Sequence, residues 1–220
     1  MKNRTRTTRI VADFLLSLAI GLMLLSGCAL VGGEGDQETL FADDFTVGQT
    51  GQWLLEGDSV AQATIRDGQL LIEVNGPNVA QFATLQEPTL SDFVVEVEAT
   101  QLAGSPDSSY GLLFRLQSPN AFYRFEITSS GLYIVERRDP AGTWTRLVED
   151  WTAAPAVQTG LHVVNRLKVE AAGPILAFYV NDQLLRQLTD ATYTAGNVAL
   201  DAGTFGQAGL QVAFDNLVVR

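Results

Sequence analysis

Alternation of apolar and polar residues at every second position dominates this chain from Leu40 onward. The segment 92–101 (DFVVEVEATQ) places four apolar residues on one face and two glutamates and a threonine on the other. The same period recurs in the segments 110–116, 171–180 and 210–218. Because a β-strand directs successive side chains to opposite faces, each segment is predicted to be a half-buried antiparallel strand.

Turn-forming dipeptides separate these segments at short intervals. They are Asp67-Gly68, Ser130-Gly131, Ala141-Gly142, Gly173-Pro174 and Asn181-Asp182. Such residues supply the positive or fixed φ values that tight reversals need. About 12 to 14 strands follow from this pattern, with almost no helix. The sequence therefore predicts an all-β fold, an antiparallel β-sandwich or jelly roll with two large curved sheets.

The N-terminus has the three zones of an export signal. Four basic residues within positions 2–9 precede an uncharged run at 14–25, which has 12 residues. A helix needs roughly 20 apolar residues to cross a bilayer, so this run fits a signal peptide better than a membrane span. It ends in Leu25-Ser26-Gly27-Cys28, which resembles the bacterial lipobox. We therefore expect cleavage after residue 27.

Cys28 is the only cysteine in the sequence, and it lies where lipidation requires a thiol. The resemblance to a lipobox implies a diacylglycerol on its sulfur and fatty acyl chains such as palmitate, and two or more chains hold a protein stably on a membrane. The alternative is an ordinary secretory signal with an incidental cysteine. Ala29 follows, where an Asp would favour retention in an inner membrane, so we expect an extracytoplasmic protein anchored at the cell surface or outer membrane.

The segment after the signal is acidic. Removing residues 1–27 takes away four basic residues and Asp13, which leaves 10 basic and 24 acidic residues. Such a charge argues against nucleic acid as a partner, because its backbone demands Lys and Arg. Residues 28–38, rich in Gly and acidic side chains, are predicted to be a flexible linker behind the lipidated cysteine. Residues 39–220 are then one domain.

Several segments together resemble a known superfamily. They are DDF (43–45), DFVVEVEA, YGLLFRLQSPNAFYRFEI with the following GLYIVE, NRLKVEAAGPILAFYVNDQLL and the closing FDNLVV (214–219). Their content and order resemble the concanavalin A-like lectin/glucanase superfamily, above all its laminin G-like members and bacterial domains of the 3-keto-disaccharide hydrolase type. The resemblance covers roughly residues 40–220. It implies a concanavalin A-like sandwich whose first and last strands pair in one sheet.

The chain lacks an evident catalytic set. Glycosidases need two carboxylates about 5–10 Å apart, and related glucanases carry Glu-x-Asp-x-x-Glu or a near variant on one strand. The nearest pattern is Glu96-Val97-Glu98, which is interpreted as a solvated sheet face. The single histidine, His162, has no G-x-S-x-G elbow beside it. We therefore predict no catalytic residue, while a sugar-cleaving enzyme stays open on the resemblance alone.

A structural calcium ion is the one cofactor that the sequence suggests. Superfamily members often hold Ca²⁺ where the first and last strands meet, which implies Asp44 and Asp215 as ligands here, with Asp43 as the alternative to Asp44. Calcium wants several carboxylate and carbonyl oxygens. Alternation places Asp43 and Asp44 on opposite faces, so at most one of them is expected to bind the ion. Otherwise these residues are ordinary strand-end and turn carboxylates.

Aromatic and planar polar side chains gather on consecutive predicted strands. Tyr or Trp can stack on a pyranose, while Arg or Glu bonds to its hydroxyl groups. The candidate ligand-binding residues are Arg115, Tyr123, Glu126, Tyr133 and Trp144. Arg115, Tyr123 and Tyr133 are expected to share one face of the sheet. Because successive residues alternate, Arg115 is expected on the face opposite to Phe114, and Arg124 on the face opposite to Tyr123.

Three functions therefore remain open. The leading hypothesis is a surface-tethered, non-catalytic β-sandwich that binds an extracellular ligand, most simply a carbohydrate. The first alternative is a glycoside hydrolase or related sugar-cleaving enzyme. The second alternative is a structural or protein-interaction module of the cell envelope. The partners expected are the membrane, through the lipid anchor, and a glycan or an envelope protein.

Overall fold

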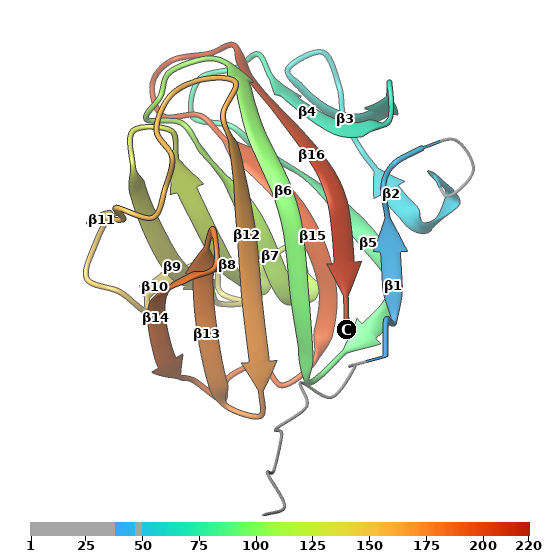
Figure 1. The fold of residues 1–220 in the computed structure, drawn as a ribbon, viewed down its shortest axis with the longest axis vertical. Coiled ribbons are helices and arrows are strands. Elements are labelled where there is room, and N and C mark those ends of the chain that lie inside the picture. Colours follow the sequence, from blue (N-terminus) through green and yellow to red (C-terminus); the bar gives the residue numbers. More distant parts are fainter. Residues whose placement is uncertain (1–37, 47–49) are drawn as a thin grey trace, which may run out of the picture. The chain divides into compact units, whose positions relative to one another are not determined.

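The computed structural model describes residues 38–46 and 50–220, which are almost entirely β-strand (Figure 1). The predicted signal segment, Cys28 and nearly all of the predicted linker lie outside the described residues. The described part belongs to one compact unit, Gln37–Arg220. In the part of the chain that the structure describes, no helix has the length and apolar character to cross a membrane.

The strands form two eight-stranded antiparallel sheets, named sheet A and sheet B. Sheet A contains, in spatial order, β14 (Gln183–Thr189), β13 (Ile175–Val180), β12 (Val164–Ala172), β6 (Phe93–Ala103), β16 (Leu210–Val219), β4 (Gln69–Val74) and β3 (Ala61–Arg66), with β1 (Phe41–Asp43) paired to β16. Sheet B contains β10 (Trp144–Arg146), β9 (Leu132–Arg138), β8 (Ala121–Thr128), β7 (Ser109–Ser118), β15 (Gly196–Gly203), β5 (Ala80–Leu90) and β2 (Trp53–Leu55), with β11 (Thr152–Ala153) paired to β9.

The sandwich fold is confirmed, but the described residues contain sixteen strands rather than about 12 to 14. The difference arises because β1, β2, β10 and β11 have only two or three residues, too few to show a period of two. In residues 38–46 and 50–220 the single helical element is a 3-10 turn, η1 (Thr50–Gln52). The predicted turns hold, because Asp67-Gly68 and Asn181-Asp182 have positive φ values and close the β3–β4 and β13–β14 hairpins.

The core lies between the two sheets, where aromatic rings join them. Phe178 of β13 lies 5.9 Å from Phe114 of β7 and 5.2 Å from Phe125 of β8, measured between ring centroids. Burial of such rings is the main favourable term in folding. The core residues run from Phe41 to Val219. The unit from residue 37 onward therefore contains the apolar contacts that its own folding requires.

The predicted strands deviate from simple alternation at two places. The segment 171–180 is split by the Gly173-Pro174 turn into the end of β12 and the whole of β13. In β7 the pairing register shifts after Phe114, and Arg115 has a φ of 47°. This bulge ends the alternation, so Leu116 joins a cluster separate from the main core, contrary to the single apolar face expected for 110–116.

Candidate functional site

Two buried carboxyl groups lie on the outer face of sheet B, the face turned away from sheet A. In the sheet register, Gly111 of β7 is opposite both Glu126 of β8 and Asp201 of β15. Directly opposite residues point to the same side of a sheet, so the two carboxyl groups flank a position without a side chain. Glu126 has no exposed surface, and Asp201 is 2 % exposed.

The hydrogen bonds of this carboxyl pair are incomplete. Ser109 Oγ donates to Glu126 Oε1 at 2.8 Å. Arg124 Nε lies 3.1 Å from Glu126 Oε2, but without the alignment of a hydrogen bond. Among the described residues, Glu126 Oε2 and Asp201 Oδ1 have no hydrogen-bond partner. Burial and the charge of Glu126 raise the pKa of Asp201 well above its ordinary value, against the opposing charge of Arg124.

Arg124 connects the carboxyl pair to the surface. Its Nη2 atom donates to Glu136 Oε2 of β9 at 2.5 Å. Burial acts to lower the pKa of Arg124, but Glu126, Asp201 and Glu136 raise it above the ordinary range, so the guanidinium stays charged. The same guanidinium lies 4.1 Å from the ring centroid of Trp144, a cation–π contact.

Trp144 is the exposed aromatic residue of this face, on the short edge strand β10. Its residue surface is 41 % exposed. Arg138 also lies against the ring, at 4.9 Å, and Phe122 meets it edge-on at 5.7 Å. Beneath it, Phe122 packs with Leu113, Leu116, Ala199 and Phe82 in a second apolar cluster on the outer face. The face thus combines an aromatic surface with guanidinium and carboxylate groups, which suits a ligand with both apolar faces and polar groups.

Comparison with known proteins defines the fold. No protein-family model matches the chain, and no curated protein matches it in sequence. Solved structures match well. The carbohydrate binding module CBM66 from Bacillus subtilis has a TM-score of 0.62 at 16 % identity, over 77 % of this chain and 95 % of that chain. A protein of unknown function with a galectin-like fold from the same organism has 0.63 at 12 %, over 84 % and 96 %.

The catalytic domain of an endo-1,3-beta-glucanase from Thermotoga petrophila RKU-1 has a TM-score of 0.56 at 13 % identity, over 83 % of this chain and 96 % of that chain. The described domain of the present chain likewise has a concanavalin A-like jelly-roll fold. Identities this low show that the fold is shared, but they say nothing about shared chemistry.

Arg115 has a structural position rather than a ligand-facing one. Its side chain has no exposed surface. The guanidinium donates to the carbonyl oxygens of Ser91, Gly173 and Tyr193 at 2.8–3.2 Å. The alternation predicts an outward Arg115 side chain, but the bulge turns this side chain toward the loops that contain Ser91, Gly173 and Tyr193. Burial lowers the pKa of Arg115.

Tyr123 and Tyr133 belong to the main core of the jelly roll. The Tyr123 hydroxyl donates to Asp190 Oδ1 at 2.6 Å, and burial together with this bond raises the pKa of Tyr123 to about 12. Tyr133 lines a hollow of about 290 Å³ at the edge of the sandwich, with Val148, Glu149, Thr152 and Arg186. Arg115, Tyr123 and Tyr133 therefore all lie on the buried side of the sheet, away from Trp144.

The acidic residues of sheet A differ from those of sheet B. Glu96 and Glu98 are partly exposed on the outer face of sheet A, as the sequence predicts. Glu96 pairs with Arg166 at 3.7 Å, and Glu98 accepts a hydrogen bond from Asn216 at 3.0 Å. His162 is exposed in a loop.

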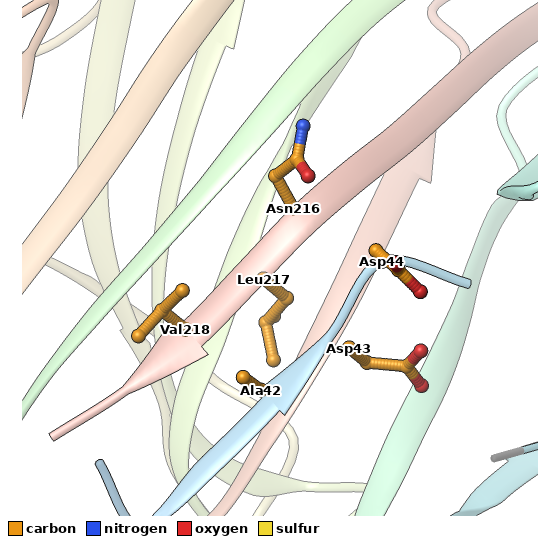
Figure 2. Close-up of a pocket in the computed structure, with 6 residues that line it drawn as sticks. All are labelled: Ala42, Asp43, Asp44, Asn216, Leu217 and Val218. Carbon is orange, nitrogen blue, oxygen red and sulfur yellow. The ribbon is translucent and has the colours of Figure 1, made fainter. Parts of the chain in front are cut away.

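The predicted calcium site lies where β1 pairs with β16. A hollow of about 270 Å³ lies there. Asp43, Asp44 and Asn216 are among the residues that line it (Figure 2). Asp43 points inward as an acceptor for the Trp53 indole N–H at 2.9 Å, and Asp44 is exposed and accepts from Thr46. Burial and the charges of Glu98 and Asp44 raise the pKa of Asp215.

The carboxylates at this hollow are few. Within residues 38–46 and 50–220, no three His, Cys, Asp or Glu side chains are grouped to hold a metal. Calcium takes about six to eight oxygen ligands, which include carbonyl oxygens. Asp43 is buried and Asp44 is exposed, so Asp44 is the more accessible of the two alternatives, and the calcium ion stays a prediction.

Asp201 and Arg138 were not among the candidate residues from the sequence. Asp201 is the one charged residue in an otherwise apolar and small strand, GNVALDAG, which is a signal for a buried carboxyl group. Gly111 inside the apolar strand β7 is a second signal, because a glycine there often marks a close approach of neighbouring groups.

Proposed function

We propose that this protein is a lipid-tethered binding module whose jelly roll holds an extracellular carbohydrate on the outer face of sheet B. The observation that carries the proposal is exposed Trp144, held by Arg124 and Arg138 above a second apolar cluster. A pyranose ring offers an apolar face to such a surface and hydroxyl groups to its rim. The similarity to a carbohydrate binding module supports this class of ligand.

The test uses the self-contained unit 37–220, since it holds its own core. We would measure its binding by calorimetry to laminarin and to an array of neutral and acidic polysaccharides. The proposal is supported if Trp144→Ala removes binding and Phe205→Ala retains it. Phe205 is similarly exposed, but it lies against Trp151 instead of on the Trp144 face. If Arg186→Ala removes binding and Trp144→Ala does not, the ligand sits in the edge hollow. Absence of binding to every polysaccharide contradicts the proposal.

The tether is the second part of the proposal, and it rests on the sequence of residues 25–28. Cells that express the full chain and take up labelled palmitate should incorporate the label into the protein. Cys28→Ser should lose the label and release the protein from the membrane fraction. Retention of the label in Cys28→Ser would mean that the chain is not lipidated at Cys28.

A sugar-cleaving enzyme is the second candidate, because Glu126 and Asp201 form a carboxyl pair in which Asp201 holds a proton more tightly than usual. Glycoside hydrolysis needs one protonated and one ionised carboxyl group. Both groups are buried, however, so a substrate does not reach them in this conformation. This observation favours binding without cleavage. Release of reducing sugar from laminarin by the wild-type unit, lost in Glu126→Gln, would reverse that preference.

A further inference from the structure

The cluster around Arg124 holds more carboxyl groups than cations. Glu126, Glu136 and Asp201 all act on the single guanidinium of Arg124. Arg146 of β10 is a further cation at the rim, with its Nε atom 3.9 Å from Glu136 Oε1 and its side chain half exposed, and Arg138 lies against Trp144. Three ionised carboxylates would therefore leave a buried excess of negative charge, which is costly away from water.

The neighbouring strands supply no further charge to Asp201. On β5 its opposite residue is Phe82, and on β7 it is Gly111. A Cβ atom on Gly111 would lie 2.0 Å from the Phe125 carbonyl oxygen, so the β7 and β8 backbones meet closely at this point. No side chain separates the two carboxyl groups across this strand.

The two unpartnered oxygens, Glu126 Oε2 and Asp201 Oδ1, belong to this same pair. Both are acceptors when ionised, and neither can bond to the other without a hydrogen between them. A proton on Asp201 removes the excess charge and gives both oxygens a partner, because Asp201 can then donate to Glu126.

We infer that Asp201 keeps a proton that it donates to Glu126, and that this proton positions Arg124 and hence Trp144. When Asp201 releases the proton to water at higher pH, a second buried negative charge forms. Arg124 is then drawn toward the carboxylates and away from the indole ring. The surface of Trp144 thus responds to pH through a group that it does not touch. The consequence for a bound glycan rests on the proposed function, whereas the proton and its effect on Trp144 do not.

Nuclear magnetic resonance of the unit 37–220 tests this inference without a ligand. The carboxyl group of Asp201, followed by its carbon signal, should stay protonated above about pH 4, where exposed aspartates titrate, and the Trp144 indole N–H signal should shift with the same midpoint. In Asp201→Asn the indole signal should lose this shift, and in Glu98→Gln, on sheet A, it should keep it.

Three results would overturn the inference. They are titration of Asp201 with the exposed aspartates, a raised titration of Asp201 that leaves the indole signal unchanged, and no titration of Asp201 before the domain unfolds. If a glycan binds, its affinity should also fall above the same midpoint in the wild type and not in Asp201→Asn. A fall of roughly 5- to 150-fold is the usual range for coupling between two sites. Failure of all glycan binding would contradict the proposed function and leave the resonance test intact.

Discussion

Arg115 Nη2 donates a hydrogen bond to the carbonyl oxygen of Gly173 at 2.8 Å, which joins strand β7 of sheet B to the β12–β13 turn of sheet A. The same guanidinium bonds to the carbonyls of Ser91 and Tyr193. Gly196 is required beside it, because a Cβ atom there would lie 2.3 Å from the Arg115 carbonyl carbon. One buried side chain thus closes one end of the sandwich.

Arg115→Ala should lower the free energy of unfolding by about 3 kcal/mol or more, because the carbonyl groups of Ser91, Gly173 and Tyr193 lose their donor. Arg115→Lys should recover part of this loss, since a lysine keeps the charge but lacks the planar fork. Urea unfolding of the unit 37–220 measures both. A loss below about 1 kcal/mol for the alanine variant would show that water replaces the guanidinium without cost.

Trp144→Ala should separate binding from stability. Because the ring is exposed, its loss removes a cation–π contact worth about 0.5–2 kcal/mol, and the fold should persist. Affinity for a glycan that the wild type binds should fall at least about tenfold, as for a central aromatic contact. Calorimetry and thermal unfolding on the same samples give the two values, with Phe205→Ala as the matched variant. Equal affinity in wild type and Trp144→Ala would remove this face from consideration.

Asp201→Asn should change how stability depends on pH. The folded state raises the pKa of Asp201, so its contribution is fully present below about pH 4 and is lost as pH rises toward the folded pKa. The slope is at most about 1.4 kcal/mol per pH unit. Asparagine does not titrate, so the variant should gain on the wild type across that interval. Urea unfolding at a series of pH values measures the difference, and a constant difference would contradict the raised pKa.

Gly111→Ala should destabilise the domain by about 3 kcal/mol, since the added carbon meets the rigid β8 backbone. Gly203→Ala is the matched control on the neighbouring strand β15. A Cβ atom there has its nearest contact, Ser109 Oγ, at 3.5 Å. Its cost should stay below about 1 kcal/mol. Equal costs for the two variants would mean that β7 and β8 can separate locally.

Addition or removal of calcium should leave the melting temperature of the unit 37–220 unchanged. Among the described residues, no third His, Cys, Asp or Glu side chain joins Asp43 and Asp44 at this hollow, and Asp43 already accepts a hydrogen bond from Trp53. Thermal unfolding with CaCl₂ and with EDTA checks this expectation. A rise with calcium that Asp44→Asn abolishes would restore the site that the superfamily resemblance implies.

Local patterns were sufficient to predict the sandwich and several of its turns. The apolar face of β6 and the Asp67-Gly68 hairpin are properties of adjacent residues, and period and turn chemistry report them directly. The short strands β10 and β11 carry too few residues for the same inference.

The candidate site could be predicted only in part, because its members come from distant strands. Glu126 and Asp201 meet only because β15 pairs with β7, and no local pattern gives this strand order. The bulge at Arg115 also depends on distant loops, because the inward guanidinium donates hydrogen bonds to the carbonyl oxygens of Tyr193 and Gly173. Glu126 and Trp144 were identified by residue type, whereas the partner that explains Glu126 was not.

The pairing of β1 with β16 brings Phe41 opposite Val219. The two ends of the domain are therefore neighbours in one sheet, and Figure 1 shows the chain end beside β1. A short peptide could join them, and new ends could be opened at the Asn181-Asp182 turn of the edge hairpin β13–β14. With the tether proposed above, a circularly permuted domain of this kind would carry its attachment point on a different side, and so present the Trp144 face to a membrane at another angle.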